Sequence, residues 1–179
     1  GSFTTTFEIR VENLGDVTLD SLQVVDSLAL YFADADSFAI ERLEANNFSV
    51  NTDFNGDTDI NLLSGEDILA VGEEGTIELE VTVYPGAAVD SQFYNIAFAS
   101  AISPAGDTLV DQSTNGSNPD PNGDGDPAES DTTFVSFMDM PVVGVAKRIS
   151  EGPINNGDGS FTTTFEIRVE NLGDVTLDS

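Results

Sequence analysis

The sequence contains no cysteine, no histidine and no tryptophan, and its single lysine is Lys147. Without cysteine there is no disulfide and no thiol nucleophile, and without cysteine or histidine the commonest zinc sites are excluded. The lack of histidine also leaves no evident pair of nucleophile and base. Asp16 and Asp26 are carboxylates of the kind that an acid–base pair needs, but we interpret them as turn and surface residues. We therefore expect no enzymatic activity.

Positive charge is scarce. Lysine and arginine total 5 against 33 aspartates and glutamates, so the formal net charge is −28. A surface of this kind repels nucleic acid and anionic membranes, and we expect neither as a partner. It is tolerated in high salt, or where divalent cations neutralise it. No apolar run approaches the length of a membrane helix, so no membrane insertion is expected within these residues.

The most informative feature is an internal repeat. Residues 1–21 recur letter for letter as residues 159–179, at an offset of 158. Chance does not produce a match of this length, and self-similarity at a fixed period is typical of repeat architectures. Here the period has the length of a whole domain. The repeated stretch carries a net charge of −3, which leaves −25 for one period.

Alternating apolar and polar residues predict β-strands along most of the sequence. In residues 3–11, Phe7, Ile9 and Val11 share one face, and residues 76–84 alternate in the same way. With turn signals between strands and almost no helix, the pattern predicts an all-β, Ig-like antiparallel β-sandwich, repeated head to tail. The other elements we expect are strands at 17–25, at 38–43 paired with 47–50, at 92–103 in the centre of a sheet, at 108–110 and at 132–138, with a short helix within 29–37.

Residues 142–150 and 160–171 predict a β-hairpin around the Asn- and Gly-rich turn 155–159. Because strand 3–11 repeats strand 160–171 without a preceding hairpin partner, we expect residues 1–139 to form a sandwich repeat that lacks its first strand. Residues 140–179 then begin the next repeat. The open edge of strand 3–11 should be filled by the preceding unit's counterpart of 142–150. The short linker 138–141 predicts a fixed orientation between units, with Met138, Met140 and Pro141 partly buried.

A family resemblance covers most of one period. Residues 7–28 resemble the opening of the "conserved repeat" surface domains, known as domain of unknown function eleven, in which a strand is followed by N-x-G-x-V-x-L and then V-x-D. Residues 63–83 fit the same pattern, and residues 113–126 look like the acidic loop late in related bacterial repeats. The resemblance implies an Ig-like sandwich in a secreted, often very long bacterial or archaeal surface protein, without enzymatic activity.

Residues 120–131 nearly reproduce the spacing of a twelve-residue calcium loop, with oxygens at alternate positions and Gly125 at the sharp turn. Hard carboxylate oxygens that converge in a tight loop suit this cation. Position 12 is Asp rather than Glu, position 8 is Pro127, and no helices flank the loop. We predict Ca²⁺ here, against the alternative of a disordered acidic loop. The candidate ligands are Asp120, Asn122, Asp124, Asp126, Glu129 and Asp131.

A second acidic loop, 53–67, is a weaker calcium candidate. Asp53, Asn55, Asp57 and Asp59 alternate along it, but Gly56 stands at position 4 and Ser64 at position 12. The alternative is a solvated turn. The segment 155–158 is a third acidic stretch, and we interpret it as the hairpin turn.

These features together predict the repeating unit of an extracellular filament or long cell-surface stalk, with calcium making its acidic loops rigid. Its partner is then a neighbouring copy of itself, since a head-to-tail contact that does not close generates a fibre. Successive units are either one covalent chain or separate subunits joined by strand donation. The alternatives are the stalk of an adhesin and a secreted carbohydrate-binding module. The lack of tryptophan and the small number of tyrosines count against the carbohydrate-binding module.

Overall fold

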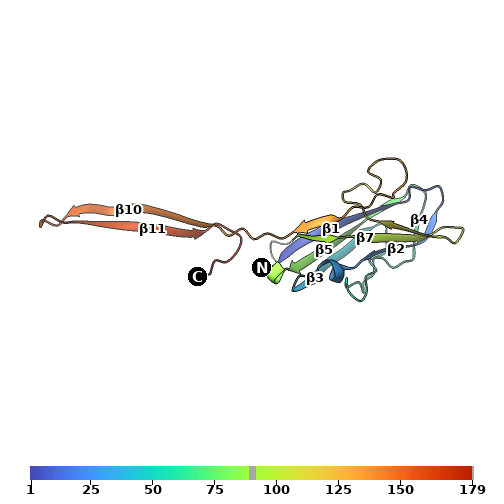
Figure 1. Ribbon diagram of the computed structural model, residues 1–179, viewed down its shortest axis with the longest axis horizontal. Helices are drawn as coiled ribbons and strands as arrows, with labels where there is room; N and C mark the ends of the chain where they lie inside the picture. Colours follow the sequence, from blue (N-terminus) through green and yellow to red (C-terminus); the bar gives the residue numbers. More distant parts are fainter. Residues whose placement is uncertain (89–91, 179) are drawn as a thin grey trace. The chain divides into compact units, whose positions relative to one another are not determined.

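The computed structural model describes residues 1–88 and 92–178 and divides the chain into two compact units, Gly1–Phe137 and Met138–Ser179 (Figure 1). The first unit contains two main sheets and a smaller two-stranded sheet. The second unit contains one hairpin. Within these residues, no helix is long and apolar enough to cross a membrane.

The first main sheet has the order β1-β5-β3, with strands at Phe3–Glu12, Glu74–Tyr84 and Ser37–Asn46. Both pairings are antiparallel, and β5 lies in the centre. Its alternation is the clearest in the sequence, and Ile77, Leu79, Val81 and Val83 are fully buried. The predicted inward face of β5 is therefore confirmed.

The second main sheet has the order β4-β2-β7-β8, with strands at Asp67–Leu69, Leu19–Asp26, Ala97–Ile102 and Thr108–Gln112. The small sheet pairs β6 (Gln92–Asn95) with β9 (Thr133–Ser136). Only two short helical turns occur in the described residues, α1 (Leu28–Tyr31) and η1 (Gly86–Ala88). The edge position expected for residues 108–110 is confirmed by β8.

One apolar core lies between the two main sheets. Phe7 and Val11 from β1 belong to the same buried cluster as Leu22 and Val24 from β2 and Ala101 from β7. Full burial of one such side chain contributes roughly 1.5–3 kcal/mol. The antiparallel β-sandwich predicted from the alternating strands is confirmed for this unit.

Two sequence predictions about strands are wrong. Residues 92–103 form two strands rather than one, since the side-chain oxygen of Asn95 accepts a hydrogen bond from the Ile96 N–H at 3.0 Å, where the ladder is interrupted. Strand 38–43 pairs with β5 instead of 47–50, because Asn47 has a φ of 68° and turns the chain away. Val50 instead bridges Leu63.

The loop 51–67 is also more than a solvated turn, because Phe54, Leu62 and Leu63 are buried in the core. It packs closely on α1 at Gly56, where an added Cβ would lie 2.9 Å from the Cβ of Leu28. The loop also lies along β2, where the N–H of Leu62 donates to the Val24 carbonyl at 2.8 Å.

The predicted hairpin is confirmed and is longer than expected. β10 (Val143–Asn155) pairs antiparallel with β11 (Phe161–Asn171), with register shifts between Ile149 and Ile154. The prediction that Met138, Met140 and Pro141 are partly buried concerns the junction between the two units and stays a prediction. Within the second unit, the backbone N–H of Met140 donates to the Asp174 carboxylate at 2.7 Å.

The two copies of the repeated stretch fold alike. The side-chain amide of Asn13 donates to the Val17 carbonyl at 2.8 Å, and Asn171 donates to Val175 at 2.7 Å. Their neighbours differ, however. In the part of the chain that the structure describes, β1 pairs with β5 alone and β11 with β10 alone. The open edge predicted for strand 3–11 is thus present.

Candidate functional sites

The acidic loop 113–131 is ordered by hydrogen bonds from its own backbone. The two carboxylate oxygens of Asp120 accept from the N–H groups of Gly123 and Gly125 at 2.7 and 2.9 Å. The side-chain oxygen of Asn122 accepts from the Asp124 N–H at 2.8 Å. The glycines have φ values of 74° and 84°, which glycine adopts at no steric cost. The predicted tight turn around Gly125 is present.

The turn brings three carboxylates together. Oxygens of Asp120, Asp124 and Glu129 lie within 4.8 Å of one another. Asn122 donates its side-chain amide to Glu129. Two predicted ligands, Asp126 and Asp131, are not part of this group, and the Asp131 carboxylate instead accepts from the Thr132 N–H at 2.7 Å. The tenth loop position, Glu129, thus occupies the place expected for the twelfth.

The oxygens of this group fit a hard cation. The Oε2 atom of Glu129 is buried, and no hydrogen-bond partner for it occurs among the described residues. A buried carboxylate oxygen without a partner is costly, and a bound cation would satisfy it. On β8, burial raises the pKa of Asp111, and the charges of Glu129 and Asp126 raise it further. The loop therefore concentrates negative charge that a cation would neutralise.

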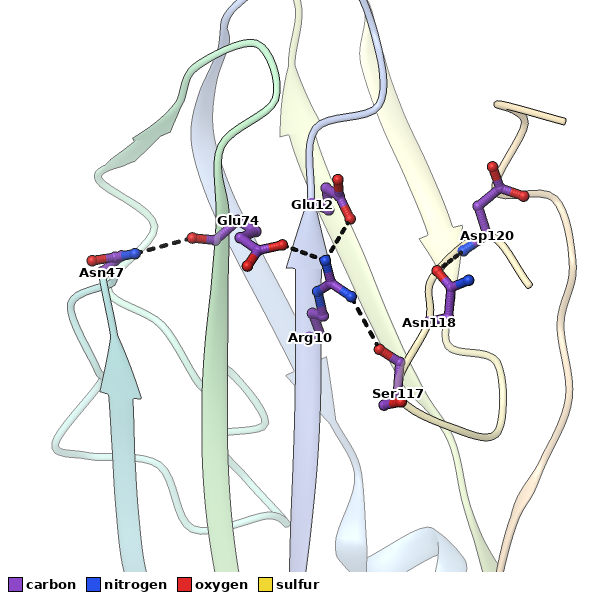
Figure 2. Close-up of polar contacts among 7 residues, drawn as sticks. All are labelled: Arg10, Glu12, Asn47, Glu74, Ser117, Asn118 and Asp120. Carbon is purple, nitrogen blue, oxygen red and sulfur yellow. Dashed lines mark hydrogen bonds and ion pairs between the residues drawn. The ribbon is translucent and has the colours of Figure 1, made fainter. Parts of the chain in front are cut away.

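Arg10 attaches the loop to β1 (Figure 2). Its guanidinium forms ion pairs with Glu12 at 3.0 Å and with Glu74 on β5, and it donates to the Ser117 carbonyl at 3.3 Å. Glu74 also raises the pKa of Arg10 through this hydrogen bond. Arg10 thus holds the acidic loop beside the open edge of β1.

The second predicted calcium loop is closed by hydrogen bonds rather than by convergent carboxylates. The side-chain oxygen of Asn55 accepts from the N–H groups of Asp57 and Asp59, each at 3.0 Å. Asp59 accepts from Asn51 and Asn61, and these bonds lower its pKa, the Asn51 bond most. In the residues that the structure covers, Asp53, Asp57 and Asp59 form no three-carboxylate group.

A different polar pair lies inside the sandwich. Asp26, which the sequence suggested to be a surface residue, is 1 % exposed, whereas Asp16 is exposed as predicted. Asp26 lies at the end of β2 and accepts a hydrogen bond from the side-chain amide of Asn95 at 2.6 Å. The interpretation of Asp26 as a surface residue is wrong because Asp26 falls on the same face as Leu22 and Val24, which point into the core.

Burial makes the Asp26 carboxyl group unusual. Desolvation raises its pKa to about 7, and the hydrogen bond from Asn95 offsets only part of that increase. Its Oδ1 atom is buried and has no partner among the described residues. Near neutral pH this group therefore interconverts between a carboxylic acid and a carboxylate, next to a side-chain amide.

Two clefts run along the open edge of β1. The smaller, of about 180 Å³, is lined by Phe7 and Ile9 of β1 and by Asn95. The larger, of about 540 Å³, lies between Val11 and the second main sheet, including Val24. Asn95 therefore contacts Asp26 on one side and borders an open cleft on the other.

Asp26 and Asn95 were not predicted from the sequence as functional residues, although the sequence holds a signal for Asp26. The alternation of Leu22 and Val24 places Asp26 on the inward face of its strand. Asn95 lies in an apolar stretch and has no comparable signal.

No known family matches the sequence, and no curated protein does. Among solved structures, the chain is similar to domains D2 and D3 of the major pilin SpaD from Corynebacterium diphtheriae, with 12% sequence identity and a TM-score of 0.38. That similarity covers 93% of this chain and 67% of the other.

Proposed function

We propose that this chain is a structural repeat of an extracellular filament or long cell-surface stalk of the conserved-repeat type. Its partner is a neighbouring copy of itself, and calcium makes its acidic loop rigid. The observation that carries the proposal is the recurrence of residues 1–21 as residues 159–179. A sequence that repeats with the period of a whole domain describes an array of like units.

The strand pairings support the array. Among the described residues, the repeated strand has one partner in each unit, β5 for β1 and β10 for β11. An exposed strand edge is a template for pairing with another chain or unit, and native proteins normally cover it. Repetition of the period supplies a neighbour for every such edge except those at the two ends of the array, so the assembly can grow without limit.

The charge distribution supports the role of calcium. Each period carries a net −25, and Asp120, Asp124 and Glu129 bring three of these charges within 4.8 Å. Like charges at this distance repel, and a divalent cation reverses the repulsion. The buried, unpartnered oxygen of Glu129 is the feature of the loop that a cation best explains.

The array is tested on the native material. Antibodies against this chain should detect, in the surface fraction of the source cells, a species whose mass under denaturing conditions is several times the 18.9 kDa of this chain, or a ladder of such masses. Electron microscopy with the same antibodies should label fibres at regular intervals. A single soluble species of one unit's mass that labels no fibre would rule out a covalent filament or stalk. If only one unit's mass is found and the antibodies do label fibres, the units are separate subunits.

Calcium is tested on the full chain by thermal unfolding. A ligand that binds only the folded state stabilises it by about 2.7 kcal/mol when present at 100 times its dissociation constant. Chelator should therefore lower the melting temperature of the parent chain. Glu129→Gln should remove most of this shift, whereas Glu66→Gln, at an exposed position of the other acidic loop, should retain it. Equal melting temperatures for the parent with calcium and with chelator would contradict the calcium part alone.

A further inference from the structure

The two copies of the repeated strand use opposite edges. The N–H of Asn13 donates to the Glu73 carbonyl at 3.0 Å. The backbone N–H and C=O groups of odd-numbered residues of β1 therefore point toward β5. The N–H of Leu172, the counterpart of Leu14, donates to the Val142 carbonyl at 2.8 Å. The backbone N–H and C=O groups of even-numbered residues of β11 therefore point toward β10. Successive residues of a strand direct their backbone groups to opposite edges. One strand of this sequence therefore accommodates both neighbours, in the order β10-β1-β5-β3.

The side chains also fit a β10 segment placed beside β1. Phe7 and Val11 are 7% and 9% exposed in the sandwich, whereas their counterparts Phe165 and Val169 are 52% and 65% exposed in the hairpin. The same sequence is thus buried only where a second sheet covers it. On β10, Val145 lies opposite Val169, on the face that would meet the core. A β10 segment beside β1 would extend that face over the cleft of about 540 Å³ next to Val11.

The lysine of β10 lies on this inward face. Lys147 pairs in register with Ile167, the counterpart of Ile9, and its Nζ lies 4.3 Å from the ring centroid of Phe165. The counterpart of Phe165 is Phe7, which lines the cleft of about 180 Å³ together with Asn95. A β10 segment that pairs with β1 as it pairs with β11 therefore carries its amine into the cleft that Asn95 borders.

We propose that β1 accepts the β10 segment of a second copy and that the Lys147 amine of that copy forms an amide cross-link with the side chain of Asn95, assisted by Asp26. This inference rests on the proposed function in one respect, since it requires a neighbouring copy. It makes the junction between the hairpin and the sandwich covalent.

The reaction balances without a cofactor. The neutral amine of Lys147 attacks Cγ of Asn95, a C–N bond forms, and the bond from Cγ to Nδ2 breaks. Asp26 as a carboxylic acid donates a proton toward the amide, which favours attack, and it regains a proton from the attacking nitrogen. The products are a secondary amide and one ammonia, and nothing is oxidised or reduced.

The environment suits this chemistry. Burial keeps the Asp26 carboxyl protonated to higher pH than an exposed aspartic acid. The hydrogen bond of 2.6 Å already places the acid on the amide that would react. Phe32 and Phe93 belong to the buried core near β6 and help to exclude water, which would compete with the amine.

The acidic loop lies beside the same edge and must move outward as the strand enters. Its described hydrogen bond to β1 joins the Arg10 side chain to the Ser117 carbonyl, and it uses no backbone group of β1. In the hairpin, the residue opposite the counterpart of Arg10 is the small Ala146. Arg10 therefore has room to remain on the outer face when the strand pairs.

The test uses the full chain preceded by a second copy of its residues 138–158, which recreates the hairpin in front of Gly1. The intact mass under denaturing conditions should be lower than the sequence mass by one ammonia. Mass spectrometric fragmentation of a proteolytic digest should identify a cross-linked peptide pair in which Lys147 of the added segment is bonded to Asn95. Lys147→Arg in the added segment should restore the sequence mass, whereas Lys147→Arg at the original position should not. Asn95→Ala and Asp26→Asn should also restore it.

The outcomes separate the parts of the proposal. Hydrogen exchange of the β1 amides should slow in the extended chain, including in the Lys147→Arg variant, which reports strand pairing independently of the bond. If the β1 amides are protected but the mass is unchanged, the strand pairs without a covalent bond. The contact of Lys147 is then an ion pair with Asp26 or Asp111, and the cross-link is overturned. Unprotected amides would overturn the pairing as well. Neither result bears on whether the native material is a filament, which its mass and labelling decide.

Discussion

Replacement of Asp26 by asparagine should change how stability depends on pH. The folded chain raises the pKa of Asp26 from 3.8 to about 7, so the folded state binds this proton more tightly than the unfolded state. The group's favourable contribution is fully present below about pH 4 and is lost as pH rises through about 7. A shift of about three units at 1.36 kcal/mol per unit corresponds to a loss of about 4 kcal/mol in the free energy of unfolding.

Asp26→Asn removes this pH dependence and adds a separate, constant cost. Its carbonyl can still accept from Asn95, but its amino group replaces Oδ1, which has no partner among the described residues. A buried unsatisfied donor costs about 1–3 kcal/mol. The variant should therefore be less stable than the parent at pH 4 and as stable or more stable at pH 8.

Urea unfolding followed by circular dichroism at several pH values measures this difference. Between pH 4 and pH 8 the difference in unfolding free energy between parent and variant should change by about 4 kcal/mol. Asp16→Asn, at an exposed turn position, is the matched control and should follow the parent. A difference between parent and Asp26→Asn that is the same at both pH values would refute the argument from burial.

Three further substitutions test the packing. Leu79→Ala, at a fully buried position of β5, should lower the unfolding free energy in urea by about 2–5 kcal/mol. Gly75→Ala places a Cβ 2.6 Å from the Asn46 carbonyl oxygen and should cost about 1–3 kcal/mol in the same assay. A neutral effect at either position would contradict the packing described. Arg42→Gln should lower the melting temperature at low salt and have little effect in high salt, because it removes the cation shared by Glu44, Glu78 and Glu80. An effect that persists in high salt would point to lost packing instead.

The strands with one buried face were the most predictable elements. In β1 and β5, apolar and polar residues alternate, and the register of a half-buried strand follows from that pattern. Residues 92–103 are apolar on both faces, so their sequence does not mark the break at Ile96. The pairing of β3 depends on the left-handed conformation of Asn47, which composition does not specify.

The candidate sites were predictable only in part. The spacing of residues 120–131 correctly indicated a tight acidic turn, but not that Glu129 would join Asp120 and Asp124 while Asp131 bonded to the backbone. That choice depends on how the chain after Pro127 returns to the sheet. The contact of Asp26 with Asn95 joins positions 69 residues apart, and only the fold brings them together.

In a filament of the proposed kind, the ion pairs of the arginines have a consequence for neighbouring fibres. Arg10, Arg42, Arg148 and Arg168 all lie within hydrogen-bonding distance of glutamates of their own unit, so their positive charge is already matched locally. Such a surface offers little cationic area for side-by-side adhesion. An assembly of these units would then behave as a polyelectrolyte brush, in which the osmotic pressure of the counterions keeps the fibres apart. The spacing between fibres should shrink as salt is added, since screening shortens the range of the repulsion.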